Sequence, residues 1–226
     1  MNKRGTHVGI IASFSVFILF LVALYVVVEP VISQQKDKDL VINYLELRLL
    51  QEFSGNLTTA IISNCSGYML QIPLADIRIK DSPDLKQIAK DKNNNVIQSQ
   101  KALGIVNIAS TSEDVLWLYL AEVNFNSTGI GSAGDQGLYE VESIRFTKEI
   151  FEEKIINGTI NFETLKTNLK IPQGTEFSFS FKMQNNTIIN AREVNTSLEV
   201  IAKEIPIQYY DERANKLNGK INIKIW

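Results

Sequence analysis

The stretch VGIIASFSVFILFLVALYVVV, from Val8 to Val28, decides the fold of the N-terminal part of this chain. Its 21 residues include no charged side chain and no Pro, Asn or Gln. As an α-helix it would be about 31 Å long, which matches a bilayer hydrocarbon core of about 30 Å. In lipid every backbone polar group needs a partner within its own segment. We therefore predict a transmembrane helix over residues 8–28, with membrane lipid as its first partner.

The charges beside this helix indicate its orientation. Lys3 and Arg4 precede it, whereas the charges that follow it nearly cancel. Because the basic flank stays in the cytoplasm, we expect residues 1–7 to form a cytoplasmic leader and the chain after the transmembrane helix to lie outside the cell membrane. The alternative is a cleaved secretory signal, which has a shorter apolar core and a small-x-small cleavage site. Residues 29–33, EPVIS, offer no A-x-A pattern, so we favour an uncleaved, single-pass anchor.

Acceptor sites for N-linked glycans support the outward placement. The pattern N-x-S/T occurs six times, always after the apolar helix. Such sites receive glycan only on an exterior surface, although each one also reads as an ordinary turn residue. The six candidate N-glycosylation sites are Asn56, Asn64, Asn126, Asn157, Asn185 and Asn195.

Composition narrows the class of protein. The chain is 45% hydrophobic with a net charge of −2, and its isoelectric point lies near 5.6. These values argue against a basic nucleic-acid binder, so no nucleic acid is expected as a partner, and also against a disordered tail. Cys65 is the only cysteine, which rules out an intramolecular disulfide. An exterior domain of this size can fold without one.

The chain after the anchor is expected to begin with a stalk. Residues 31–53 contain no Gly or Pro and have helical periodicity, and Pro30 could kink the helix or mark its boundary. Leu40, Tyr44, Leu47 and Gln51 fall on one line along this helix. Close to this line lie Val41, Leu45, Arg48 and Leu49. We predict an amphipathic stalk helix over residues 29–55, with an apolar face that packs against the domain it carries.

The remainder, residues 56–226, reads as a mostly antiparallel β domain with a few short helices, so the predicted fold class is α+β. The segment 219–226 alternates Ile with polar residues and is expected to be held in the sheet to its end. The predicted strands are 59–64, 68–74, 76–81, 105–109, 115–125, 138–146, 176–183, 187–191, 198–203, 205–210 and 219–226. The predicted short helices are 84–89, 147–156 and 162–169, with a turn at Asn157-Gly158 between the last two. The aromatic residues read as core are Trp117, Tyr119, Phe177, Phe179 and Phe181.

A glycine-rich segment matches a nucleotide-binding pattern but lacks its context. Gly129-Ile130-Gly131-Ser132-Ala133-Gly134 fits G-x-G-x-x-G. A dinucleotide site needs a helix to start at these glycines. Here the alternating segment LYEVESIRF follows, which predicts a strand. We expect an exposed hairpin loop and no cofactor.

The inventory of reactive side chains argues against an enzyme. The one histidine, His7, lies at the edge of the apolar helix, so Ser-His-Asp and Cys-His arrangements and histidine-based zinc sites have no basis in the exterior domain. No calcium-loop pattern is present. The carboxylate pairs Glu140/Glu142, Glu152/Glu153 and Asp211/Glu212 are expected on solvated faces. We predict no catalytic residue and no metal site.

The layout as a whole resembles archaeal type IV pilin-like proteins. The features that carry this resemblance are the short leader ending in Lys3-Arg4-Gly5, the long apolar helix next to it and the β domain with many glycan acceptors. The KRG-x-HVG start and the closing stretch IPIQYYDERANKLNGKINIKIW are also similar to single-span pilin-like proteins of small-genome archaea. The resemblance implies that a membrane peptidase cuts between Gly5 and Thr6, and that the helix then packs in a filament core. Because Ile10 replaces the Glu of bacterial pilins and the domain is large, it implies a minor pilin or a pilin-derived protein.

Two functional hypotheses remain open. The first is a structural or assembly subunit, whose helix contacts other pilin-like subunits through its small residues Gly9, Ala12, Ser13 and Ser15. The second is a permanently anchored, glycosylated binding module that does not polymerise, with its ligand at the loops of residues 126–137. The first predicts a cleaved leader, and the second predicts a retained one.

Overall fold

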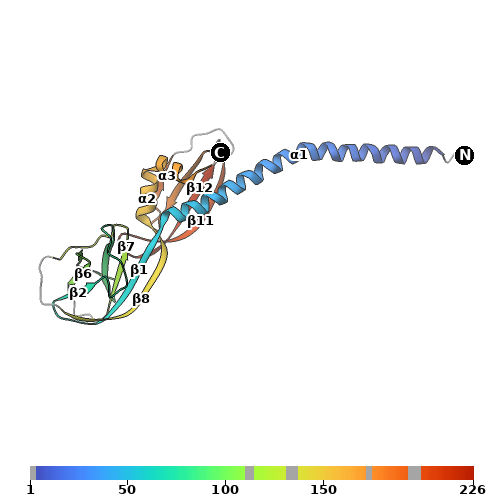
Figure 1. The fold of residues 1–226 in the computed structure, drawn as a ribbon. Helices are drawn as coiled ribbons and strands as arrows, with labels where there is room; N and C mark the ends of the chain where they lie inside the picture. The colour runs from blue at the N-terminus through green and yellow to red at the C-terminus, as the bar shows by residue number, and fades with distance from the viewer. Residues whose placement is uncertain (1–3, 110–114, 131–136, 172–174, 193–199) are drawn as a thin grey trace. The chain divides into compact units, whose positions relative to one another are not determined.

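The computed structural model describes residues 4–109, 115–130, 137–171, 175–192 and 200–226. The chain divides into two compact units, Met1–Tyr44 and Leu45–Trp226. The first unit is helical and the second consists mostly of β-strands. Helix α1, Arg4–Phe53, contributes residues to both units (Figure 1). Its helical residues run without a break through Pro30, which therefore does not end it. The predicted α+β class, an N-terminal apolar helix followed by a mostly antiparallel β domain, is confirmed.

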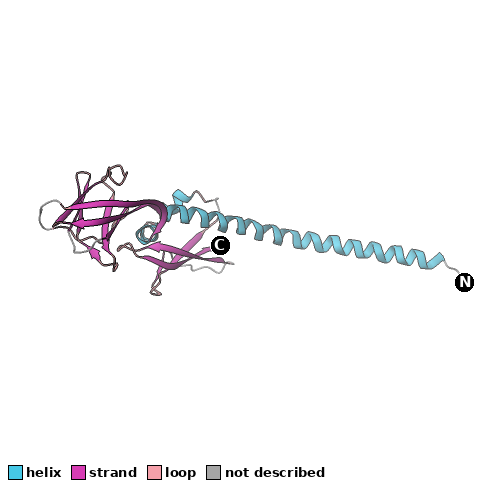
Figure 2. Cartoon of the chain, turned by 90° about the horizontal axis from the view of Figure 1, so that it is seen from below, coloured by secondary structure: helices cyan, strands magenta, loops and turns pink. Residues whose placement is uncertain are grey.

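The β unit holds twelve strands and two short helices among its described residues (Figure 2). The strands are β1 Ser54–Ser66, β2 Met69–Pro73, β3 Lys86–Asp91, β4 Val96–Ile97, β5 Ser99–Ala102, β6 Ile105–Ala109, β7 Val115–Ala121, β8 Leu138–Phe151, β9 Phe177–Lys182, β10 Ile188–Asn190, β11 Ile201–Tyr210 and β12 Lys216–Ile225. The helices are α2 Glu152–Ile160 and α3 Phe162–Leu169.

The strands form one large sheet and one small one. The large sheet has the order β10-β9-β12-β11-β8-β1-β7-β3-β4, and the small one has the order β2-β6-β5. β11 and β8 pair in parallel at Tyr209↔Ile150 and Tyr210↔Phe151, whereas the other described pairs are antiparallel. This short parallel contact divides the large sheet into a helix-covered block, β10-β9-β12-β11, and a sandwich block, β8-β1-β7-β3-β4.

In the helix-covered block, alternating aromatic and Ile side chains form one buried face. Phe177, Phe179 and Phe181 on β9 pair with Ile225, Ile223 and Ile221 on β12, and all six are at most 1% exposed. The end of α1 packs on this face through Phe53, whose ring centroid lies 5.4 Å from that of Phe179. Helix α3 packs there through Phe162, at 5.0 Å from Phe177. The predicted burial of the three Phe residues is confirmed, and the three Ile residues of β12 share the buried face.

In the sandwich block, the small sheet lies against β1 and β7 with an aliphatic core between them. One buried cluster joins the two sheets. It contains Ala60 and Ile62 of β1, Leu116 and Leu118 of β7, and Leu70, Ile72, Val106 and Ile108 of the small sheet. Alternation on β7 places Leu116, Leu118 and Leu120 inside. Trp117 and Tyr119 are therefore only half-buried, whereas the sequence predicted burial in the core.

Of the apolar residues predicted on the stalk helix, Leu45 and Leu49 are buried, whereas the line through Leu40 and Leu47 is not. Leu40 and Leu47 are 68% and 71% exposed, whereas Leu45, Leu49 and Phe53 are at most 1% exposed. These three lie four residues apart and so share one face of the helix. Both lines contain apolar residues, and only the partner sheet decides which line is buried.

Three local predictions are corrected by tertiary pairing. Residues 76–81 form turns instead of a strand, and 84–89, predicted as a helix, mostly belong to strand β3, which pairs with β7 and β4. Residues 147–151 extend β8, so α2 starts only at Glu152 and contains the predicted turn at Asn157-Gly158. Of the predicted strand 198–203, residues 198 and 199 lie outside the described residues, and 201–203 form a single strand, β11, with 205–210, which includes Pro206. Around Pro206 this strand is paired on one side only, which a residue without a backbone N–H tolerates.

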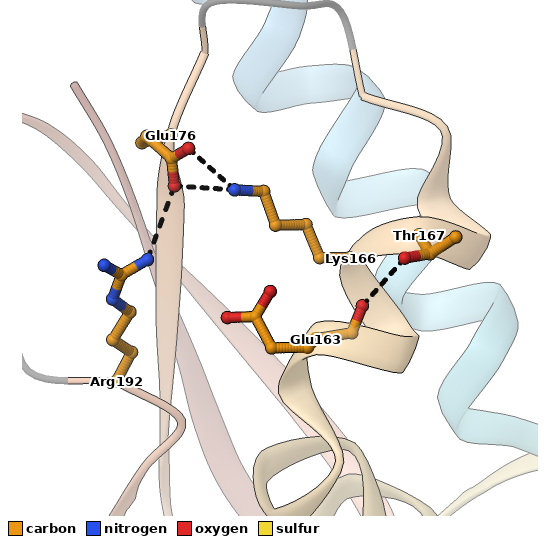
Figure 3. A network of polar contacts seen from close by, with 5 residues as sticks. All are labelled: Glu163, Lys166, Thr167, Glu176 and Arg192. Atoms are coloured by element: carbon orange, nitrogen blue, oxygen red, sulfur yellow. Dashed lines mark hydrogen bonds and ion pairs between the residues drawn. The ribbon is translucent and has the colours of Figure 1, made fainter.

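The C-terminus is held in the sheet, as predicted. Trp226 N donates to Glu176 O at 3.1 Å, and Glu176 N donates to Trp226 O at 3.2 Å. The Glu176 side chain accepts from Lys166 of α3 at 2.7 Å and from Arg192 at 3.4 Å (Figure 3). In the same network the Thr167 hydroxyl donates to Glu163 O at 3.0 Å. The start of β9, the chain end and helix α3 are thus joined at one point.

Candidate functional site

The main candidate site is the exposed apolar surface of α1. Residues Ile11–Glu29 have a mean hydropathy of 2.8, are long and apolar enough to cross a membrane, and bury none of their side chains within the chain. The side chains of Leu19 and Val27, for example, are 68% and 72% exposed. Each apolar Å² left in water costs about 25 cal/mol, so a surface of this kind requires lipid or another protein chain as its cover.

The small residues near the N-terminal end of this surface are also exposed. These residues are Gly9, Ala12, Ser13 and Ser15. No atom would lie within 4 Å of a Cβ added at Gly9. Another helix could therefore approach closely here. Gly5 and Thr6, the residues that flank the predicted cleavage, lie in the first turns of α1, while Lys3 is outside the described residues.

Five of the six predicted glycan acceptors are described, and all five asparagines are exposed. Asn56 and Asn64 belong to β1, Asn126 follows β7, Asn157 lies in α2 and Asn185 in the β9–β10 turn. Asn195 lies outside the described residues.

The described acceptor sites differ in their hydrogen bonds and in the exposure of their hydroxyl residues. Asn64 Nδ2 donates to Glu140 Oε2 at 2.8 Å, and Asn126 Nδ2 donates to Glu212 Oε1 at 3.3 Å. The hydroxyl residues of two acceptors, Thr58 and Thr159, are only 7% exposed.

The glycine-rich segment is only partly described. Gly129 and Ile130 lie on the surface, and residues 131–136 are outside the described part of the chain. Strand β8 begins at Leu138, so a strand and not a helix follows the glycines, as predicted. The helix N-terminus that a pyrophosphate would need is therefore not formed after Gly137.

The predicted carboxylate pairs have local structural partners. Glu142 accepts from Ser63, and Glu153 accepts from the backbone and side chain of Asn124. Glu152 approaches Asp211 and Glu212, a grouping that the sequence did not predict. Burial, and then the charges of these two carboxylates, raise the pKa of Glu152 above its usual value. Within the described residues, no set of three or more His, Cys, Asp or Glu side chains is arranged to hold a metal ion.

Lys90 is the most deeply buried cation of the described residues, at 1% exposure. Its Nζ donates to Asn94 Oδ1 at 2.9 Å, to Asn215 Oδ1 at 2.8 Å and to Ala214 O at 3.1 Å. Burial lowers the pKa of Lys90, and the charge of Asp211 partly opposes this effect. Lys90 therefore joins the β3–β4 hairpin to the β11–β12 hairpin.

The two hairpins that Lys90 joins have the same turn. In each, an Asp side chain accepts from the backbone N–H groups two and four residues later, and from the side chain of the Asn at the fourth position. The residue three positions after the Asp, Asn94 in one turn and Ala214 in the other, has a positive φ of 65° or 52°. The repeated pattern Asp-x-x-x-Asn at 91–95 and 211–215 is the signal that sequence reasoning missed.

Hollows on the surface of the described β unit include two of similar size. One, of about 530 Å³, is lined by residues of β9, β11, β12 and the β9–β10 turn that include Lys182, Gln208 and Lys220. The other, of about 510 Å³, is lined by Asn56, Thr58, Arg78, Lys80, Phe146 and Lys148 among others. We call the second one the Asn56 hollow. The sequence could not predict it, because its residues come from four separate segments.

Comparison with protein-family models, curated proteins and solved structures gave no match to this chain.

Proposed function

We propose that this chain is a single-pass, membrane-anchored surface protein of the pilin-like type, acting as a structural or assembly subunit. The observation that carries the proposal is that the two ends of α1 have different surroundings. Its N-terminal part leaves Ile11–Glu29 entirely exposed, whereas Leu45, Leu49 and Phe53 belong to the core of the β unit. A helix with these two parts can attach a folded domain to a bilayer or to a bundle of like helices.

The direction of the chain in the membrane is part of the proposal. Lys3 and Arg4 would stay in the cytoplasm, and the β unit would lie outside. The five exposed glycan acceptors support this placement. A structural rather than a catalytic role is supported by the carboxylate pairs, since Glu142 and Glu153 are engaged in contacts with neighbouring strands and loops.

The deciding experiment is the N-terminal peptide and intact mass of the protein isolated from its native membrane. A chain that starts at Thr6 supports the pilin-like subunit. A chain that keeps Lys3-Arg4-Gly5 contradicts it. Gly5→Leu, which changes the residue at the cut, should block processing, whereas Gly9→Ala, which lies beyond it, should leave processing unchanged.

Helix self-association can be tested separately by cysteine cross-linking. Replacing Cys65 with Ser removes the native thiol, and Ser13→Cys then places one thiol among the small residues of α1. Oxidation in the membrane should give disulfide-linked dimers. Val27→Cys, on the part of the span that carries large side chains, is the matched control and should cross-link less, because bulky side chains keep the helix backbones apart.

A second function is favoured by the exposure of Asn126 and Gly129, which belong to the described part of segment 126–137. Here the chain is a permanently anchored, glycosylated binding module that does not polymerise. It predicts a retained leader, no filament, and no cross-linking through Ser13→Cys. The same two experiments therefore separate the two functions.

A further inference from the structure

The Asn56 hollow lies over one face of the central strands of the sandwich block. Asn56 pairs with Lys148, and Thr58 pairs with Phe146, across β1 and β8. Because paired residues of antiparallel strands point to the same side, these four side chains share one face. On the other side of β1, Thr58 pairs with Leu120 of β7. The hollow thus has a floor of Thr58 and Leu120, with Asn56 at its edge.

The walls of the hollow combine an aromatic ring with positive charge. Phe146 is 58% exposed, an unusual position for a Phe side chain on a central part of a sheet. Arg78, Lys80 and Lys148 also line the hollow and are exposed, against one carboxylate, that of Glu122. Within the described residues none of these three cations forms an ion pair. The hollow therefore suits a ligand with an apolar C–H face and a negative charge.

We propose that Asn56 carries an N-linked glycan whose first sugars occupy the Asn56 hollow, stacked on Phe146, with an acidic sugar facing Arg78, Lys80 and Lys148. Asn56 starts an N-x-S/T acceptor, lies at the edge of the hollow and is exposed. A sugar attached to its amide would enter the hollow without the entropy cost of binding a free ligand. The volume of about 510 Å³ lies within the range of small-molecule sites.

The covalent step has a defined balance. The Asn56 amide nitrogen forms a bond to the anomeric carbon of a sugar carried on a lipid phosphate, and the bond from that carbon to the phosphate oxygen breaks. The amide loses one proton, and the lipid phosphate leaves with the bonding electrons. Since Thr58 is only 7% exposed after β1 has paired, this acceptor is reached while the chain is still unfolded. Asn185, in an exposed hairpin turn, has no such restriction.

The proposal rests on the outward placement of the β unit in the proposed function, and it is tested on the full-length protein from its native membrane. Glycopeptide mass analysis reads the modification of Asn56, with Asn185 as the reference acceptor. Four proteins are then compared by thermal unfolding in detergent: wild type, Asn56→Gln, Phe146→Ala and the double variant. Leu138→Ala, which removes another exposed apolar side chain of β8, is the matched control.

The expected results are specific. The Asn56 glycopeptide carries at least one carboxylated or sulfated sugar. Phe146→Ala lowers Tm by about 2–4 °C more in the glycosylated protein than in the Asn56→Gln background. Leu138→Ala shows no such dependence on Asn56. An unmodified Asn56 beside a modified Asn185 overturns the inference and leaves the outward placement intact.

Two other outcomes also overturn it. If Phe146→Ala has the same effect with and without the glycan, the sugars do not occupy the hollow. If the glycan is entirely neutral, the assignment of the three cations to an acidic sugar is wrong. The pilin-like function is judged independently by the residue at the N-terminus, so neither outcome is confused with its failure.

Discussion

Truncation of Leu49 to Ala should strongly destabilise the fold, whereas truncation of Leu47 to Ala should not, although the two residues lie on the same helix only two positions apart. Leu49 is 0% exposed and Leu47 is 71% exposed. Removing a buried Leu side chain loses its transfer free energy and leaves a cavity, for a cost of about 3 kcal/mol. Removing an exposed one changes the free energy of unfolding by at most about 0.5 kcal/mol, and Ala is also a good helix former.

The assay is urea unfolding of the full-length protein in detergent micelles, followed by the fluorescence of Trp117 and Trp226. Both report on the β unit, because Trp117 lies on β7 and the backbone of Trp226 pairs with Glu176. Leu49→Ala should lower the free energy of unfolding by about 3 kcal/mol, with a Tm shift of about 6–12 °C. Leu47→Ala should leave both unchanged.

The reasoning is refuted if Leu47→Ala is the costlier variant, because the line that contains Leu40, Tyr44 and Leu47 would then be the buried one. It is also refuted if Leu49→Ala costs less than about 0.5 kcal/mol, the range of ordinary surface substitutions. In either case the end of α1 does not pack on the sheet in the observed register.

Three further substitutions test individual contacts. Lys90→Met should lower the free energy of unfolding by about 2–4 kcal/mol, because three oxygen acceptors lose their donor. Glu152→Gln should raise Tm at pH 7 and have little effect below about pH 4, where the carboxyl is protonated in both states. Gly137→Ala should cost about 1–3 kcal/mol, because its Cβ would lie 2.0 Å from Ser66 O, whereas Gly129→Ala, with nothing within 4 Å, should be neutral.

The expected pH dependence at Glu152 follows from the direction of its pKa shift. Folding raises the pKa of this carboxyl, so the folded protein holds the proton more tightly than the unfolded chain does. Stability falls as the pH rises through the interval between the two pKa values, and this loss persists at neutral pH. Equal destabilisation by Glu152→Gln at pH 4 and pH 7 would contradict this account.

For Lys90→Met, an unchanged urea midpoint would show that the three hydrogen bonds of Lys90 contribute nothing to stability.

Local patterns predicted several elements closely. The helix over 162–169 and the strand over 105–109 agree with α3 and β6, and the helical run 31–53 ends with α1 at Phe53. In each case the residues have both the periodicity and the propensity of the element they form. The segment 84–89 shows the limit of this reasoning. Its composition allows a helix, but pairing with β7 on one side and β4 on the other makes most of it a strand.

The candidate sites divide in the same way. The six acceptors follow from a short contiguous motif, so they can be named from the sequence, and the predicted cut between Gly5 and Thr6 is what the resemblance to pilin-like proteins implies. The Asn56 hollow, the Lys90 bonds and the approach of Glu152 to Asp211 each join residues far apart in the chain. Sequence reasoning missed them because no local pattern specifies which strands become neighbours.

The apolar span, the charge asymmetry around it and the α+β class can be read from the amino-acid order, because uninterrupted hydrophobicity and short-range periodicity are properties of contiguous residues. Packing against the sheet selects Leu45, Leu49 and Phe53, not the line through Leu47, as the buried face of the helix end. Strand pairing likewise joins the two sheet blocks through a short parallel contact at Tyr209 and Tyr210. Both outcomes depend on which surfaces are buried together, and burial is a property of the assembled fold.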